Sequence, residues 1–239
     1  MVRVASWSSA VLFLTLVCRL TLGQAPQADA SRLSNGTVSG NTYHNPDLGI
    51  RYEFPSGWSV NDPNHFMKPE HQFSWQEGKA AKGESKSQCF KTVLFVSAHP
   101  DGMHTNEYDP MATLTVVDPR CTAGVAFPTS IDDQQQIQSA GDQVINHLAP
   151  PAVEYKTHPH IRAFNNGGKV TLEISRQLTL NTFSAQRQNI QQVKASTLIM
   201  EINRYWVIWT FVSADDGNLN KMREGKIYFD STDAAPSGK

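Results

Sequence analysis

Short segments in which apolar and polar residues alternate recur along the chain and predict β-strands. In residues 50–54, isoleucine, tyrosine and phenylalanine alternate with arginine and glutamate, so one face of such a strand is buried and the other is wet. Gly, Pro, Asn and Asp residues separate several of these segments, which favours hairpins. The predicted strands are residues 42–44, 50–54, 58–60, 90–96, 112–117, 160–164, 170–174, 195–202 and 205–212.

Two segments have the features of helices. Apolar residues recur at every third or fourth position between residues 137 and 148, which predicts an amphipathic helix. Ser130 and Asp133 precede it as a cap and its capping-box partner, and Pro150 follows it as a terminator. A second, short helix is expected from an aspartate at position 215 or 216 to residue 226.

Two polar stretches show no clear periodicity. Residues 61–88 end in a run of Lys, Gly, Ala, Ser and Glu from position 77, which predicts a mobile loop. Residues 179–192 are polar and rich in Gln, which is typical of a long loop or an irregular helix. The order of strands, a helix, more strands and a last helix therefore predicts an α+β fold, a largely antiparallel sheet with helices packed on it.

The aromatic segment near the end of the chain has two interpretations. Tyr205, Trp206, Trp209 and Phe211 could form a platform on which a sugar ring stacks. Strand alternation instead places Trp206 on one face of the sheet, and Tyr205, Trp209 and Phe211 on the other. With helices over both faces, we expect all four side chains to belong to the core.

The N-terminus has the three parts of a secretory signal peptide. Arg3 is followed by an apolar run over residues 11–17, and the small residues Gly23 and Ala25 come next. We expect residues 1–25 to be this signal, with cleavage after Gly23 or Ala25. The apolar run is too short to anchor the chain across a bilayer. The prediction is export to a periplasmic or extracellular space.

Cys18 leaves open a second interpretation of this segment, because a lipid-modified cysteine can follow such an apolar run. The residue before it is Val17, where a lipoprotein signal would carry a small residue, so we favour the cleaved signal peptide.

The remaining chain is divided by composition into a linker, one domain and a tail. Residues 26–40 are small, polar and aperiodic and are expected to be a flexible linker. Residues 41–229 then form a single globular domain, and residues 230–239 form a polar tail. The 21 basic and 22 acidic residues nearly balance, which argues against nucleic acid as a partner.

Two cysteines remain after the predicted cleavage. Cys89 precedes the strand at residues 90–96, and Cys121 follows the strand at residues 112–117. If these strands pair antiparallel, the two cysteines lie at the same end of the pair. We therefore expect a disulfide in an oxidising compartment, with two buried free thiols as the alternative.

Two short motifs resemble PsbP-like (Mog-type) domains. Residues 45–50 (NPDLGI) and 54–58 (FPSGW) are similar to the opening of that family, and the aromatic strand at residues 205–211 before a short helix is similar to its close. The resemblance would cover residues 41–229 and implies an αβα sandwich. It also implies an accessory or adaptor protein, since members of the family serve in such roles. The chain resembles the exported bacterial members, many of which have no known role.

The chain contains no common catalytic motif. It lacks the nucleophile elbow, the His-Glu-x-x-His metalloprotease motif and the Cys-x-x-Cys motif. Residues 78–83 have the glycine spacing of a phosphate loop, but Glu84 stands where that loop needs lysine. We predict no catalytic residues and no cofactor.

One histidine-containing loop could bind a divalent transition metal weakly. His99, Asp101 and His104 lie close together in the sequence, and imidazole and carboxylate groups are ligands of Zn²⁺, Cu²⁺ and Mn²⁺. The alternative is a solvated polar loop, since the spacing matches no established metal motif.

Taken together, these features predict an exported, non-enzymatic accessory or binding module of the cell envelope with a protein partner there. The alternative is a small metal-dependent or hydrolytic enzyme that uses the loop from His99 to Asp109.

Overall fold

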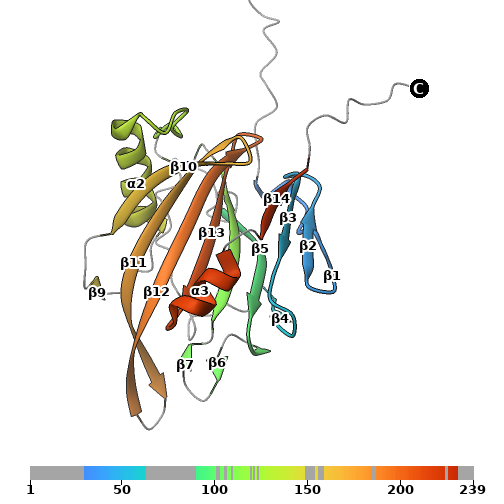
Figure 1. The fold of residues 1–239 in the computed structure, drawn as a ribbon, viewed down its shortest axis with the longest axis vertical. Helices are drawn as coiled ribbons and strands as arrows, with labels where there is room; N and C mark the ends of the chain where they lie inside the picture. Colours follow the sequence, from blue (N-terminus) through green and yellow to red (C-terminus); the bar gives the residue numbers. More distant parts are fainter. Residues whose placement is uncertain are drawn as a thin grey trace, which may run out of the picture.

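A computed structural model of the chain describes residues 30–62, 90–100, 103–104, 107–108, 110–118, 120, 122, 124–148, 154–155, 159–184, 187–223 and 226–230. Its largest element is an antiparallel eight-stranded sheet (Figure 1). Seven strands follow the order β10-β11-β12-β13-β8-β5-β4, and β9 pairs with β11. Their bounds are β4 (Ser59–Val60), β5 (Phe90–Ser97), β8 (Met111–Val117), β9 (Glu154–Tyr155), β10 (His160–Asn166), β11 (Lys169–Ser184), β12 (Arg187–Ile202) and β13 (Tyr205–Ser213).

A second, four-stranded antiparallel sheet has the order β1-β2-β3-β14. It lies beside the large sheet in Figure 1, with its first three strands in blue and the last in red. Because β14 comes from the end of the chain, the sheet joins segments far apart in sequence. The bounds are β1 (Thr37–Ser39), β2 (Thr42–Asn45), β3 (Ile50–Glu53) and β14 (Ile227–Phe229), and the separate pair is β6 (Met103–His104) with β7 (Glu107–Tyr108).

Three helices accompany the sheets in the described part of the chain. They are the 3-10 helix η1 (Ala30–Arg32) and the α-helices α2 (Gln134–Leu148) and α3 (Asp216–Arg223). The Asp133 carboxylate caps α2 by accepting a hydrogen bond from the Gln136 N–H at 3.0 Å. The Asp215 carboxylate caps α3 through the N–H groups of Gly217 and Asn218. The sequence thus predicted both helices, although Asp133 rather than Ser130 is the cap of α2.

The two faces of the large sheet are covered differently. Ile137, Ala140 and Val144 of α2 pack on one face against Leu172 and Trp206. The opposite face packs against the small sheet and α3, and this contact forms the larger core cluster. It includes Tyr43, Ile50, Tyr52, Leu114, Val207, Trp209, Phe211, Leu219, Met222 and Ile227.

The expected α+β sandwich, with helices packed on both faces of one sheet, is therefore wrong. The protein is β-rich, with fourteen strands and only two α-helices among its described residues. One sheet was expected, but strands β2 and β3 belong to a second sheet, which covers one face of the large sheet where helices were expected. Alternation in a strand indicates which face is buried, and the sheet that a hairpin joins is decided by long-range packing.

The aromatic segment is buried as its alternation predicted. Trp206 is in the cluster under α2, whereas Trp209 and Phe211 are in the cluster under the small sheet. The Trp209 and Phe211 rings stack at 3° with their centroids 6.1 Å apart, and the Tyr52 ring of the small sheet lies 4.5 Å from the Trp209 ring. The core interpretation of Trp206, Trp209 and Phe211 is confirmed.

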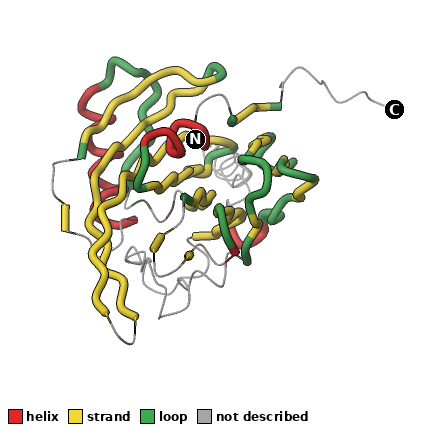
Figure 2. Tube along the Cα trace, turned by 60° about the horizontal axis from the view of Figure 1, so that its bottom comes forward, coloured by secondary structure: helices red, strands yellow, loops and turns green. Residues whose placement is uncertain are grey.

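Two polar segments that were expected to be irregular are ordered strands. Residues 179–184 and 187–192 form the outer parts of β11 and β12, which stay paired as far as Ser184 and Arg187 and project from the sheet in Figures 1 and 2. Residues 37–39, expected in the linker, form β1 and pair with β2, so order begins before Asn41. Backbone hydrogen bonds to a neighbouring strand stabilise both segments, and the side-chain pattern alone does not report these bonds.

The β10–β11 turn allows a test of how the two sheets dock. Gly167 and Gly168 have φ angles of +55° and +78°, as a two-residue type I′ hairpin turn requires. A Cβ added at Gly167 would lie 2.5 Å from the Phe229 ring of β14, whereas one added at Gly168 would meet nothing within 4 Å.

We expect Gly167→Ala to lower the free energy of unfolding by about 3 kcal/mol. Both the positive φ angle and the overpacking against the Phe229 ring destabilise the folded state. Gly168→Ala is the matched control and should lower the free energy of unfolding by about 1 kcal/mol, because only the positive φ angle disfavours alanine there. Urea denaturation followed by circular dichroism measures both. Equal losses would show that the Phe229 contact contributes nothing to docking.

No helix in the described ranges is both long and apolar enough to cross a bilayer.

Candidate functional site

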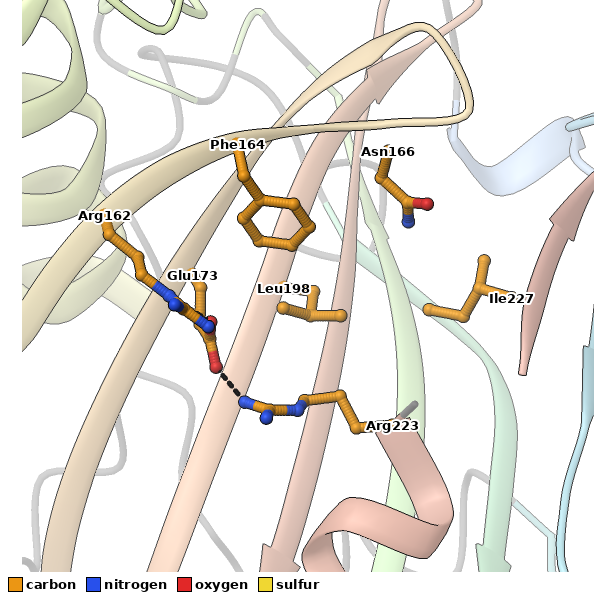
Figure 3. A pocket seen from close by; sticks show the side chains of 7 residues that line it. All are labelled: Arg162, Phe164, Asn166, Glu173, Leu198, Arg223 and Ile227. Carbon is orange, nitrogen blue, oxygen red and sulfur yellow. Dashed lines mark hydrogen bonds and ion pairs between the residues drawn. The ribbon is translucent and has the colours of Figure 1, made fainter. Parts of the chain in front are cut away.

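A pocket of about 320 Å³ opens on the face of the large sheet that also carries the small sheet (Figure 3). Strand β10 contributes three alternate residues, which alternation places on one face. Neighbouring strands and the end of α3 complete the lining. The lining residues are Arg162, Phe164, Asn166, Glu173, Leu198, Arg223 and Ile227.

The register of the β10–β11 hairpin brings the charged residues together. The turn at Gly167 and Gly168 pairs Asn166 with Lys169, and the ladder then places Arg162 opposite Glu173. On the other side of β11, Glu173 is opposite Leu198 of β12. Two guanidinium groups therefore approach one carboxylate from opposite sides, Arg162 from an edge strand and Arg223 from the last residue of α3.

Glu173 is almost fully buried, with 2% of its side chain exposed. Its Oε2 accepts a hydrogen bond from Nε of Arg162 at 2.6 Å and forms an ion pair with Nη2 of the same side chain. Its Oε1 accepts from Nη1 of Arg223, from the Ser196 hydroxyl at 3.0 Å and from the Ser175 hydroxyl at 3.4 Å. Every acceptor position of this carboxylate is therefore directed at a protein donor.

The pocket combines this charged end with an apolar wall. The Arg162 guanidinium lies over the Phe164 ring, 5.7 Å from its centroid, in a cation–π contact. Leu198 and Ile227 are buried side chains that continue the wall. Asn166 supplies an amide at the other end of the pocket (Figure 3).

The environment of Glu173 keeps its carboxylate ionised. Burial acts to raise the pKa, but the Arg162 hydrogen bond, the charge of Arg223 and the Ser196 hydrogen bond together outweigh it, so the pKa is lowered. A carboxylate with a depressed pKa and fully occupied oxygens is a poor proton acceptor at neutral pH. The geometry thus favours Glu173 as a structural anion that orients two arginines.

This pKa shift makes a prediction about acid stability. The folded pKa lies below the ordinary glutamate value of about 4.3, so the unfolded chain binds more protons in the pH window just below that value. The stabilisation by Glu173 is therefore complete above about pH 4.3 and is lost as the pH falls through the folded pKa. Urea titrations at several pH values should show a decline below pH 4.3 that is shallower in Glu173→Gln. An identical slope in both proteins would contradict the assignment.

The structure describes only some of the residues that the sequence analysis assigned to sites. Cys89 and Cys121 lie outside the described residues, so the disulfide stays a prediction. The strands beside them do pair antiparallel, with Phe90 opposite Val117.

The candidate metal ligands are likewise only partly placed. His99 is exposed in the segment after β5, and His104 is opposite Glu107 in the β6–β7 pair. Asp101 and Asp109 lie outside the described residues. Within those residues, no three His, Cys, Asp or Glu side chains are grouped so that they could hold a metal ion, and the predicted set with Asp101 stays untested.

The arginine–glutamate pocket was not found by the sequence analysis. Residues 170–174 were predicted only as one strand of a hairpin, and no role was assigned to Glu173. The turn at residues 167–168 contained the missing signal, because a two-residue turn there sets Arg162 opposite Glu173. The contribution of Arg223 depends on how α3 packs, and no local pattern reports it.

Comparison with known proteins gives no relative to guide the interpretation: no protein-family model matches the chain, and no curated protein matches it.

Proposed function

We propose that the protein is an exported, non-enzymatic binding module of the cell envelope and that the Arg162–Glu173–Arg223 pocket is its binding site. The observation that carries the proposal is the buried Glu173 carboxylate, whose two oxygens accept four hydrogen bonds from protein side chains and form a further ion pair with Nη2 of Arg162. A site built in this way holds donors in a fixed geometry for a ligand.

The pocket suits recognition rather than catalysis. A hydrolase needs a nucleophile or a general base within reach of its substrate. The lining instead offers two arginines, an amide and three apolar side chains, and its one carboxylate is engaged. Few polar groups placed on an apolar wall are typical of small-molecule binding sites.

The location and the accessory role are supported by the sequence. The apolar run at residues 11–17 and the small residues after it are typical of an export signal. The motifs at residues 45–50 and 54–58 resemble PsbP-like domains, whose members serve as accessory proteins. This support comes from the short motifs alone, because the observed fold has a second sheet where the resemblance implied a layer of helices. An envelope protein would then be the partner that receives or delivers the ligand.

Native mass spectrometry tests the proposal. The purified chain, without residues 1–25, is incubated with a small-molecule extract of the source cells, and bound mass is recorded before and after gentle desalting. We expect a retained small molecule that is recovered chemically unchanged, and we expect Arg162→Gln to retain less of it. Arg51→Gln is the matched control, because Arg51 has a similar side-chain exposure of 53% and also lies over an aromatic ring.

Two results would overturn the proposal. Recovery of a cleaved or otherwise altered molecule would favour an enzyme. Equal retention by the wild type and Arg162→Gln would place the binding site elsewhere.

A further inference from the structure

We infer that the ligand of this pocket is a small monoanionic carboxylate with an apolar, preferably planar, body. The inference rests on the proposed function and adds the chemical class of the ligand. Four features of the pocket support it: the unused edge of one arginine, the charge balance, the apolar wall and the volume.

The orientation of Arg162 leaves one edge of its guanidinium group for a ligand. A guanidinium presents two bidentate edges, Nε with Nη2 and Nη1 with Nη2. The Glu173 carboxylate occupies the first edge, and no other described residue accepts a hydrogen bond from Arg162. With 57% of its side chain exposed, Arg162 can present the Nη1–Nη2 edge to a second oxyanion. Two parallel N–H···O bonds are the geometry that a carboxylate accepts from arginine.

The charge of the lining residues favours a ligand with one negative charge. Arg162 and Arg223 contribute two positive charges and Glu173 contributes one negative charge, which leaves a net charge of +1 among the lining residues. A monoanion neutralises this charge. A phosphate monoester is mainly a dianion above pH 7, so it would leave an excess negative charge beside a buried carboxylate that the arginines keep ionised.

The wall next to Arg162 requires an apolar body. Phe164, Leu198 and Ile227 line the pocket beside the arginines, so the group that follows the carboxylate meets an aromatic ring and two aliphatic side chains. A planar ring can stack on Phe164, and offset stacking of aromatic rings is favourable. Asn166 lies beyond this wall and can pair with one polar substituent at the end of the body.

The volume of the pocket suits a small chemical group. About 320 Å³ is near the lower limit of ligand pockets, which span roughly 300–1,000 Å³. A free aromatic or short-chain carboxylic acid fits, and so does the last residue of a polypeptide with its terminal carboxylate. Both sources present the same chemistry, and the experiment separates them.

The test uses two-dimensional NMR of the chain without residues 1–25 at pH 8, with benzoate as the probe. Benzamide replaces the charge by a neutral isostere, acetate removes the apolar body, and phenyl phosphate supplies a dianion. We expect benzoate to shift the amide signals of Phe164, Glu173 and Leu198 with a dissociation constant of about 1 mM, as suits so small a ligand. The other three probes should bind at least ten-fold more weakly.

Arg162→Lys keeps the positive charge but loses the bidentate edge of the guanidinium group. We expect this substitution to weaken the binding of benzoate at least ten-fold. Arg51→Lys is the control and should change the affinity less than two-fold. A thermal scan of each variant shows whether it is folded. If Arg162→Lys unfolds, the comparison of benzoate with benzamide on the wild type still decides the role of the charge.

The peptide Gly-Gly-Phe, with a free or an amidated C-terminus, separates the two sources. Tighter binding of the free peptide than of benzoate would assign the site to a polypeptide end, and the reverse would assign it to a free acid. Equal binding of benzoate and benzamide, preference for phenyl phosphate or no shift with any probe would overturn the ligand class. In that case the proposed function would still hold if native mass spectrometry showed that the protein retains another molecule. It would be wrong if the protein retained no molecule.

Discussion

Replacement of Glu173 by glutamine is expected to lower the free energy of unfolding by about 3 kcal/mol. The substitution removes the anion that faces Arg162 and Arg223 and leaves two cations beside each other. Removing one partner of a buried ion pair costs roughly 3–5 kcal/mol, and we place this effect at the lower end because 57% of the Arg162 side chain is exposed. Urea denaturation monitored by circular dichroism measures the loss.

The matched control is Glu53→Gln. Glu53 lies 4.0 Å from the Lys226 ammonium, and 43% of its side chain is exposed. A surface pair of this kind contributes at most about 1 kcal/mol, so the control should be nearly neutral. A loss below 1 kcal/mol for Glu173→Gln would show that water solvates both arginines and that the carboxylate does not organise them.

A triple variant separates stability from binding. Replacement of Arg162, Glu173 and Arg223 by apolar residues of similar size removes the desolvation cost together with the attraction, and such exchanges are often neutral or stabilising. We expect the Arg162→Met, Glu173→Leu, Arg223→Met protein to be more stable than Glu173→Gln. The same protein should have lost benzoate binding.

Replacement of Trp209 by alanine is expected to cost about 4 kcal/mol, as is usual for a large buried aromatic residue. Trp209 is fully buried between the sheets, with its ring against Tyr52 and Phe211. Its loss would leave a cavity where the large and small sheets meet. Chemical denaturation measured by circular dichroism gives the free energy without relying on tryptophan fluorescence.

Trp209→Phe is the control for this prediction. Among the described residues, no acceptor lies within hydrogen-bonding distance of the Trp209 Nε1, so phenylalanine removes a buried donor that has no partner there. We expect a loss of about 1 kcal/mol, since the smaller ring leaves a void while the desolvation cost of the N–H is relieved. A larger loss from phenylalanine than from alanine would contradict this account of the core.

The sequence predicted local features well because they depend on neighbours along the chain. Alternation at Trp206 and Trp209 assigned the two rings to opposite faces, and the glycine pair at residues 167–168 marked a hairpin turn. An aspartate was correctly predicted to cap α3, whereas α2 was predicted with Ser130 as its cap and is capped by Asp133.

Features that depend on distant partners were missed. Residues 179–192 are polar, and residues 179–184 and 187–192 are strands because of the ladder between β11 and β12. The second sheet could not be predicted either, because β14 pairs with β3 across most of the chain. The candidate site depends on both local and distant contacts. The pairing of Arg162 with Glu173 follows from a local turn, whereas Arg223 reaches Glu173 only through tertiary packing.

The position of β14 also constrains the order in which the protein can mature. Residues 227–229 complete a sheet whose other three strands lie within residues 37–53. A chain that emerges N-terminus first, from a ribosome or a membrane channel, therefore holds the strands β1, β2 and β3 without their last neighbour until residues 227–229 have emerged. Loop closure over such a separation is slow. Final assembly is thus a late, post-emergence event, and a chain interrupted before residue 227 exposes the open edge of β3 to other molecules.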